Sequence, residues 1–451
     1  MLRYLIVLSL CVNILNAKEL FSTEKIGSYL NKENPFVYTL YSQEYNAKIR
    51  ENYFQAAFDT IISAKYDKKE YPISEGEYYD VSLKTTTQSG IELLTSYRKA
   101  EGTQEYNNIK TGDQGELLVG VKLPVIALLK NTNTKKLNLD LAHLNSEKLK
   151  YNTDNKFRAL YLNVLNSYYT LLYNKILVNL EAELLKISLE RKKLITKKVQ
   201  VGALAKISKL EAEQQIINRR QRYLSSKNSY ENSFRVFLQY LNTSKDEFTQ
   251  KYDLLNILEI QTLNTNLDEA ISTAIDNRPD LKMLKYEQDK LHLQRKNTAL
   301  LKYPNFNLSL YGVHDFKYNE GFKVALDMDF PLERNKYEST LKTINQNLKN
   351  IQAIKKQKIQ RIKTSITNIV YSLNTLNENI NYSEQELQLV KQLQKAENKK
   401  YMIGSSTLFM LNQREVYTLE VQKKVLKHKL NYLILKEDFY KEMGLSRATT
   451  N

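Results

Sequence analysis

The chain has 451 residues, enough for two or three ordinary domains, but it contains only 12 Gly and 6 Pro, both well below average usage. So few breakers predict long uninterrupted elements. Hydrophobic residues make up 42% of the chain and the mean hydropathy is −0.51. No apolar run reaches the roughly 20 residues of a membrane-spanning helix, which excludes an α-helical membrane protein.

The chain is strongly basic, with a net charge of +17. Such a charge would suit nucleic acid, a membrane surface or an acidic partner. The lysines, however, are spread along all the predicted helices with Glu and Asn between them, and no dense block of Arg with interleaved aromatics occurs. We interpret them as solvated helix faces and expect no nucleic-acid partner.

The first 17 residues, MLRYLIVLSLCVNILNA, predict export. They have a basic start at Arg3, an apolar core and a small residue at Ala17, which is typical of a secretory signal peptide. The chain's one cysteine, Cys11, follows Leu10, whereas a lipoprotein signal has a small residue there, so lipid attachment is disfavoured. The mature chain then has no cysteine and no disulfide.

In chain order, the first half begins with a polar stretch over 18–33 that we expect to be loose. Pro35 begins a helix over 35–58, because Pro suits the first turn of a helix. A β-rich segment over 59–127 follows, in which IISAKY, VSLKTTT, IELLTSY and an alternating stretch ending in GVKLPVI predict strands. Long helix then extends from about 130 to 243, with a capped restart near Thr153 and a break at Gly202.

The second half follows a connector. A short helix ends at Asn277 and the next begins at Pro279, with an acid in its first turn that suits the helix dipole. NFNLSLY and KVALDMDF alternate strictly and predict a β-hairpin over 304–331. The longest helix, about 333–400, carries apolar residues three and four apart, which predicts a coiled-coil seam from Ile359 to Val390.

The stretch around each glycine break occurs twice. KKVQVGALAKISKLEAE (from Lys197) and KKYMIGSSTLFMLNQRE (from Lys399) both run Lys-Lys, three residues, Gly, ten residues, Glu. A single Gly between long helical stretches lets the backbone turn without a Cβ penalty. We interpret each copy as the tip of a helical hairpin, centred on Gly202 and Gly404.

The flanks repeat as well. NPFVYTLYSQEYNAK resembles RPDLKMLKYEQDKLH, and a Pro ends the β segment in both halves. Each half therefore runs helix, β segment, long helix, tip, long helix, which indicates an internal duplication. We divide the chain into a signal peptide (1–17), a first repeat (18–243), a connector (244–266), a second repeat (267–443) and a short tail (444–451).

The predicted strands have one apolar and one polar face. A soluble sheet on a core would give this alternation, and so would an outer-membrane β-barrel with its apolar face to lipid. The rod-like helices favour the barrel, because they form no layer that could cover a sheet. Counting one hairpin per half gives about four strands. Four strands cannot close a ring, so we expect the barrel to be shared between two, three or four chains.

Taken together, the leader, the two helix–strand–strand–helix halves, the RPDL opening, the strand-end Pro and the VGA and IGS tips resemble the TolC family of outer-membrane efflux and secretion channels. The resemblance covers nearly the whole mature chain. It implies a homotrimer with a 12-stranded β-barrel in the outer membrane and an α-helical coiled-coil duct across the periplasm, serving efflux or type I secretion. It also implies a periplasmic adaptor (membrane fusion protein) and an inner-membrane pump as partners.

By position, the resemblance assigns the adaptor-contact tips to Val201, Gly202, Ala203, Ile403, Gly404 and Ser405. Tyr401 resembles an aromatic residue that helps to hold the periplasmic entrance shut. Family members often carry acids and an Arg just inside the entrance, where this chain has Ser208, Ser406, Met410 and Gln413. This departure argues against a charged lock and a cation-selective entrance. We expect a looser, apolar constriction near Met410.

Other chemistry is disfavoured. The four histidines, which we interpret as surface or packing residues, sit in no metal-ligand spacing: His143, His292, His314 and His428. Asp327 and Asp329 share one strand face and are interpreted as a polar lumen wall. No nucleophile elbow, P-loop, dinucleotide fingerprint or acid–base pair of carboxylates occurs. We therefore expect no enzyme, no cofactor and no metal.

The alternative is a soluble periplasmic coiled-coil scaffold or adaptor. Adaptors usually have one hairpin flanked by small β domains, so the duplication argues against it. Drug, metal, peptide and protein cargo are not distinguished by the sequence, because the duct is largely a passive pore and its pump selects the substrate.

Overall fold

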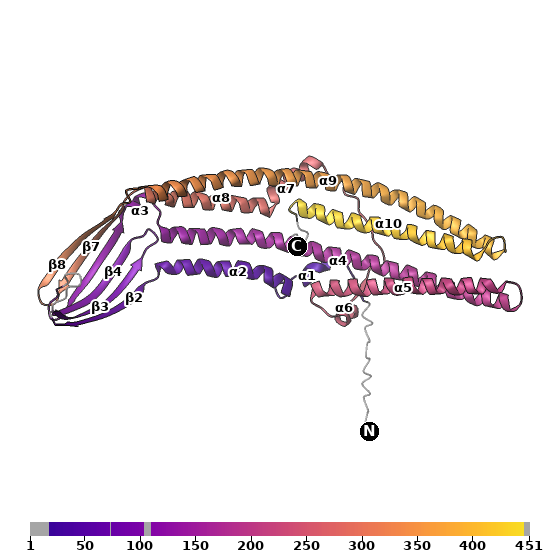
Figure 1. The fold of residues 1–451 in the computed structure, drawn as a ribbon, viewed down its shortest axis with the longest axis horizontal. Coiled ribbons are helices and arrows are strands. Elements are labelled where there is room, and N and C mark those ends of the chain that lie inside the picture. The colour runs from indigo at the N-terminus through magenta and orange to yellow at the C-terminus, as the bar shows by residue number, and fades with distance from the viewer. Residues whose placement is uncertain (1–17, 73, 103–109, 446–451) are drawn as a thin grey trace, which may run out of the picture. The chain divides into compact units, whose positions relative to one another are not determined.

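The computed structural model describes residues 18–72, 74–102 and 110–445, so the predicted signal peptide lies outside the described residues. The chain divides into two compact units, and each takes parts of both predicted repeats. Unit 1 comprises the residues up to Tyr38, Phe157–Asp276 and those from Lys363 onward, whereas unit 2 comprises Thr39–Lys156 and Asn277–Ile362. Four helices have residues in both units, one of them with only its last residue in unit 2. Figure 1 labels the helices and strands of the chain.

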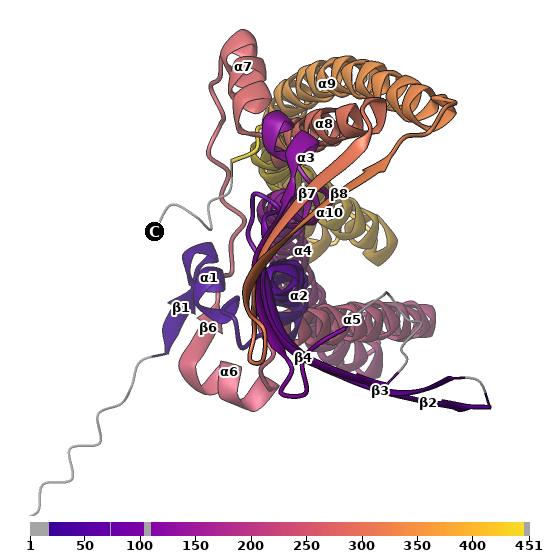
Figure 2. The ribbon, with the colours of Figure 1, turned by 90° about the vertical axis from the view of Figure 1, so that its left-hand side faces the viewer.

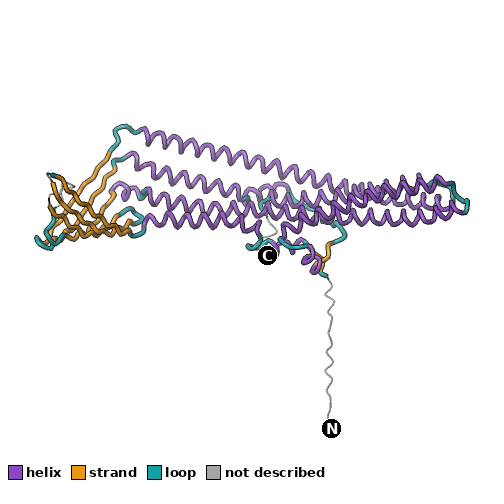
Figure 3. Tube along the Cα trace, turned by 60° about the horizontal axis from the view of Figure 1, so that its bottom comes forward, coloured by secondary structure: helices purple, strands orange, loops and turns teal. Residues whose placement is uncertain are grey.

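Unit 2 consists of helices and one sheet. Its helices are most of α2 (Pro35–Gln55), η2 (Ala56–Phe58), α3 (Val125–Lys130), the first part of α4 (Thr134–Gln200), α8 (Pro279–Thr298), η3 (Ala299–Lys302) and the first part of α9 (Asn335–Met402). Its strands are β2 (Ile61–Tyr71), β3 (Ser74–Thr86), β4 (Glu92–Gly102), β5 (Glu116–Pro124), β7 (Asn305–Asp315) and β8 (Asn319–Asp329). Figure 3 shows the helices of unit 2 continuing from the strand ends instead of lying over the sheet.

The sheet has the order β2-β3-β4-β5-β7-β8, and all five pairings are antiparallel. The predicted mixed fold is therefore correct in kind, but the count of four strands is wrong, because this sheet has six strands within the described residues. All four strand-like pieces of the first β segment form strands of this sheet, so the prediction of one hairpin per half missed a second hairpin. Figure 2 shows the sheet curving strongly from β2 to β8.

The two faces of the sheet differ in polarity. On β8, Phe322, Val324 and Leu326 lie on one face and are all exposed. The register places this face of β8 beside Leu310 and Leu308 of β7, as alternation in both strands predicts. The opposite face carries polar residues. A large exposed apolar surface of this kind marks contact with a partner or a membrane.

Unit 1 contains two long helical hairpins, together with several short helices and a two-stranded sheet. Its elements are β1 (Glu19–Phe21), η1 (Thr23–Lys25), α1 (Ile26–Tyr29), the second part of α4, α5 (Lys206–Leu241), α6 (Lys245–Lys251), β6 (Tyr252–Leu254), α7 (Leu267–Asn277), the second part of α9, and α10 (Leu408–Glu442). The predicted coiled-coil seam of α9 is confirmed, since every seam position from Ile359 to Val390 is buried or half-buried. Ser383, the one polar seam residue, donates a hydrogen bond to the Asn379 carbonyl at 2.7 Å.

Two local predictions were wrong. Helix α4 runs unbroken through Thr153, which is buried within it, so there is no restart. The stretch expected to be loose after the leader is instead ordered, because Phe21 is fully buried. Its ring packs against those of Tyr168 and Phe248 at centroid distances of 5.6 and 5.1 Å, and β1 pairs with β6 of the connector.

We predict that Phe21→Ala lowers the free energy of unfolding of unit 1 by about 3–5 kcal/mol, because it leaves a cavity among buried aromatic rings. The measurement is urea unfolding of the mature protein in detergent, followed by circular dichroism. Leu20→Ala is the control, since Leu20 is 57% exposed, and it should change stability by less than about 0.5 kcal/mol. Equal effects of the two variants would contradict the packing role of Phe21.

Candidate functional site

The two hairpin loops of unit 1 have the same backbone structure. Gly202 and Gly404 have φ of 74° and 80°, a conformation that favours glycine. The amide of Gly202 donates to the Val199 carbonyl at 3.1 Å, and the amide of Ala203 donates to the Lys198 carbonyl at 2.8 Å. The loop at Gly404 repeats both bonds, at 3.2 and 2.9 Å. Both ends are therefore Schellman motifs, as the repeated sequence predicts.

Both loops lie at the same end of unit 1 (Figure 1). The residue before each glycine is apolar and almost fully exposed, with Val201 at 79% and Ile403 at 80%. A Cβ added to either glycine would meet nothing within 4 Å. The loops thus present two apolar side chains on an open surface, which a partner could bury.

Behind the loops, Tyr401 joins the two hairpins. It is half-buried and packs on a small cluster formed by Ile195 and Ala212 of the first hairpin and Leu408 of the second. Burial raises the pKa of the Tyr401 hydroxyl above its ordinary value, and the charge of Arg191 opposes this only in part. The tyrosine therefore stays neutral at physiological pH and acts here as a packing side chain.

The four polar or apolar residues predicted just inside the entrance have different surroundings in the structure. The Ser406 hydroxyl donates to the Glu397 carboxylate of the same hairpin. Ser208 lies half-buried in the first turn of α5. Met410 and Gln413 are exposed on α10, where Thr407 caps the helix by accepting from the Met410 amide at 3.2 Å.

Deeper in unit 1 lies a buried charge cluster that the sequence patterns did not predict. Glu415 of α10 is 4% exposed and accepts hydrogen bonds from Arg191 of α4 and Arg219 of α5. The Arg219 Nη2 lies 2.5 Å from Glu415, and its Nη1 donates to the Leu184 carbonyl at 3.0 Å. One carboxylate thus binds both helices of the first hairpin to the second hairpin.

The electrostatics of this cluster depend on Glu415. Burial alone would raise the pKa of its carboxyl, but the hydrogen bonds and charges of Arg191 and Arg219 outweigh burial and hold that pKa below its ordinary value. A sequence signal existed, because Leu408, Leu411, Glu415 and Leu419 follow a spacing of three, four and four along α10. A charged residue in such an apolar stripe indicates a buried ion pair.

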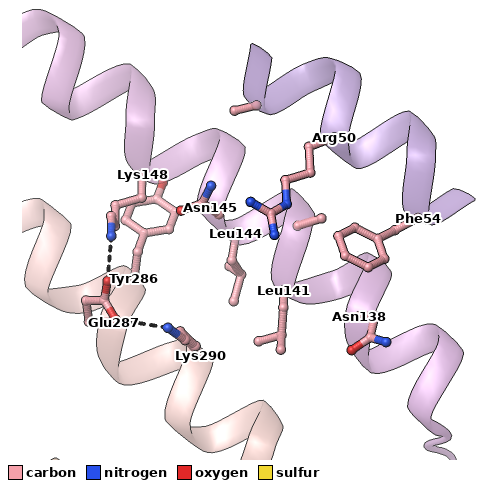
Figure 4. Close-up of a pocket in the computed structure, with 12 residues that line it drawn as sticks. Arg50, Phe54, Asn138, Leu141, Leu144, Asn145, Lys148, Tyr286, Glu287 and Lys290 are labelled. Carbon is pink, nitrogen blue, oxygen red and sulfur yellow. Dashed lines mark hydrogen bonds and ion pairs between the residues drawn. The ribbon is translucent and has the colours of Figure 1, made fainter. Parts of the chain in front are cut away.

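Unit 2 contains a pocket of about 310 Å³ between α2, α4 and α8. Glu287 there contacts Lys148 at 2.5 Å and Lys290 at 3.7 Å, while Arg50 lies beside Phe54 (Figure 4). Burial raises the pKa of Glu287, but the two lysines outweigh it and lower that pKa. A carboxylate paired in this way is a poor general base, so the pocket does not point to catalysis.

Two further features are absent from the described part of the chain. No helix there is both long and apolar enough to cross a membrane. Nor do its His, Cys, Asp and Glu side chains form any group of three or more that could hold a metal ion.

Comparison with solved structures identifies the fold. The outer membrane channel CmeC of Campylobacter jejuni matches 94% of this chain and 85% of its own, with a TM-score of 0.71 at 12% sequence identity. The outer membrane protein VceC of Vibrio cholerae matches 94% of this chain and 96% of its own, with a TM-score of 0.69 at 13% sequence identity. The open state of the Neisseria gonorrhoeae MtrE outer membrane channel matches 95% of this chain and 91% of its own, with a TM-score of 0.70 at 13% sequence identity.

No family model matches the chain, and no curated protein matches it by sequence. The similarity is therefore one of structure over nearly the whole length. The chain has the fold of outer-membrane channel proteins, and the mixed fold class with long helical hairpins and barrel-type strands is confirmed.

We predict that Glu415→Gln lowers the free energy of unfolding by about 3–5 kcal/mol near neutral pH, because it leaves two buried guanidinium charges uncompensated. The matched control is Glu213→Gln, at the same place in the first copy of the repeat. Glu213 pairs with Lys192 at 3.1 Å with both side chains 36% exposed, so its loss should cost at most about 1 kcal/mol.

The pH dependence follows from the lowered pKa of Glu415. Its ionised form contributes stability that is fully present above the ordinary value of 4.5 and is lost as the pH falls through the lower folded pKa. The gap between wild type and Glu415→Gln should therefore narrow in acid, as measured by urea unfolding at a series of pH values. A gap that stays constant through the acid range would contradict the ionised pair.

Proposed function

We propose that this protein is a subunit of an outer-membrane channel that extends into the periplasm and serves efflux. The observation that carries this function is the sheet of unit 2, which has an exposed apolar face and two free edges. The fold shared with outer-membrane channels over some 94% of the chain supports it. The predicted signal peptide supplies the route out of the cytoplasm.

The sheet suits a membrane better than water. Val119, Val324 and Leu326 of its apolar face are each more than half exposed, and the helices of unit 2 leave that face uncovered (Figure 3). Lipid would cover it at no cost in buried polar groups, while the polar face would line a water-filled lumen. Transferring such side chains out of water is favourable by a free energy of about 25 cal/mol per Å² of apolar surface.

The free edges require more than one chain. β2 and β8 each have one unpaired edge within the described sheet, and unpaired backbone groups are not tolerated in lipid. The smallest membrane barrels have about eight strands, so one six-stranded sheet cannot close on itself. Copies of the chain must complete the ring, and the resemblance to the TolC family makes three the number we propose.

The hairpin loops are the proposed contact with a periplasmic adaptor, and through it with an inner-membrane pump. Their two exposed apolar side chains, Val201 and Ile403, lie on rigid Schellman turns. A rigid apolar surface loses little entropy on binding. The energy for transport comes from the pump, and export of peptides or proteins by a type I system would use the same contacts.

We predict that the purified protein forms ion-conducting channels in planar lipid bilayers and that Met410→Ala raises the single-channel conductance. Met410 is 43% exposed on α10, and shortening it would widen an apolar constriction. Phe409→Ala is the control, since it removes a neighbouring exposed side chain on the same turn. An absence of channels would contradict the function, whereas an unchanged conductance in Met410→Ala would contradict only the constriction.

We also predict that a photocrosslinking amino acid at Val201 or Ile403 captures a periplasmic protein with a helical hairpin in intact cells. The same amino acid at Leu224, which is exposed on α5 away from the loop, is the control. Equal capture from all three positions, identified by mass spectrometry, would argue against docking at the tips.

A further inference from the structure

The hairpin of β2 and β3 is the part of the sheet that the four-strand count leaves out. Three residues of β2 lie on one face in register with three of β3, and the pairs are Ile62 with Leu83, Ala64 with Val81, and Tyr66 with Tyr79. Ile62 is 71% exposed and Val81 is 48% exposed. A β-hairpin that lay in water outside a membrane would gain nothing from an exposed apolar face of this kind.

This face is continuous with the apolar face of the other four strands. The register connects Ala64 of β2, strand by strand, to Val81, Tyr97, Leu117, His314 and Glu320. On the same face, Leu93 of β4 and Val121 of β5 lie directly opposite each other, and Leu310 of β7 follows. The apolar residues therefore form one band that crosses all six strands.

The centre of the band is displaced along the strands from β2 to β8. The band spans Ile62–Tyr66 on β2, centred on Ala64, and residues 322–328 on β8, centred on Ala325. The strand pairings place Ala64 in the same row across the sheet as Glu320. The centre of the band on β8, Ala325, lies five positions from Glu320, so the centre moves by five positions over the five strand pairings. On β4 the centre of the band lies near Thr95, two positions from the residue in the row of Ala64. On β5 it lies near Gly120, three positions from that row.

Strand tilt in a membrane produces this shift. Neighbouring strands lie about 4.8 Å apart. If the strands are tilted by about 35–45°, the point at which a strand crosses the middle of the membrane moves along the chain by roughly 3–5 Å from one strand to the next. This distance is about one residue, since a strand rises about 3.4 Å per residue. The observed shift is one position per strand. Ile62, Ala64 and Tyr66 pair directly with Leu83, Val81 and Tyr79 without a shift. The shift of one position per strand is therefore an average over the sheet, and a single level slab contains the apolar residues of all six strands.

The polar face continues through the same hairpin. One row on that face, read from β2 to β7, consists of Lys65, Asp80, Arg98, Glu116 and Asp315. Arg98 and Glu116 form an ion pair within it. The apolar and polar faces therefore keep their sides of the sheet across β2 and β3, as expected for strands that separate lipid from a lumen.

We propose that β2 and β3 are membrane-embedded, with Ile62, Tyr66 and Val81 in contact with lipid acyl chains. Each chain then contributes six strands to the barrel, and three copies of the six-stranded sheet form a ring of eighteen. The inference rests on the proposed channel function, but it changes the architecture from the expected twelve strands. The free edges of β2 and β8 from neighbouring copies are the strands that pair to close the ring.

The test uses the absence of Trp from the chain. Single variants Val81→Trp on β3, Ile62→Trp on β2 and Val119→Trp on β5 place a fluorophore on the apolar face, and Ser82→Trp places one on the polar face. Each protein is reconstituted into phosphatidylcholine vesicles with either plain or bromine-substituted acyl chains. We expect Val81→Trp and Ile62→Trp to lose most of their fluorescence in brominated lipid, as Val119→Trp does, and Ser82→Trp to be quenched by aqueous iodide instead.

Three results are distinguishable. Quenching of Val119→Trp by brominated lipid without quenching of either hairpin variant would overturn the inference and leave the channel function standing. Lack of lipid quenching at all three apolar positions would overturn the channel function itself. Quenching at Val119 and at one hairpin position is sufficient support, so the test survives the failure of either hairpin variant to fold.

Discussion

The structure depends on what covers the apolar face and the two free edges of the six-stranded sheet. An isolated chain leaves large side chains such as Phe322 and Leu326 exposed, and within the described residues β2 and β8 each have one edge without a partner strand. Water tolerates the edges but not the face, whereas lipid tolerates the face but not the edges. The ring proposed here, closed by further copies and surrounded by lipid, satisfies both. The proposed shared barrel and its water-filled lumen are the response to that one requirement.

The two helical hairpins show how a duplicated element can keep its backbone and change its chemistry. Both loops retain the same pair of hydrogen bonds and a glycine at positive φ. The glutamate that ends each copy has diverged in role, because Glu213 forms an exposed pair with Lys192, while Glu415 is buried between Arg191 and Arg219. The buried cluster joins the hairpins to each other, so any opening that separates them must first break it. Removing a partner from a buried pair is far more costly than doing so at the surface.

Periodicity and turn chemistry made much of the fold predictable. The seam from Ile359 to Val390, the glycine tips and the β7–β8 hairpin follow from local patterns that tertiary contacts reinforce. The second hairpin, β2–β3, was identified piece by piece but left out of the count, because the sequence between its two pieces, DKKEYPISEGEYYD, is rich in charged residues and carries no Asn-Gly or Asp-Gly turn signal. Order around Phe21 was missed for a similar reason, since its burial depends on Tyr168 and Phe248, which are far away in the sequence. The Glu415 cluster combines residues from three helices, and only the apolar stripe on α10 gave any sign of it.

The most direct measurement is the mass of the assembly extracted from outer membranes in mild detergent, determined by light scattering with the detergent subtracted. The account predicts a particle with three times the mass of the mature chain, recovered in the outer-membrane fraction. A water-soluble monomer in the periplasmic fraction would contradict it, because the apolar face and both edges of the sheet would then have to be covered within a single chain.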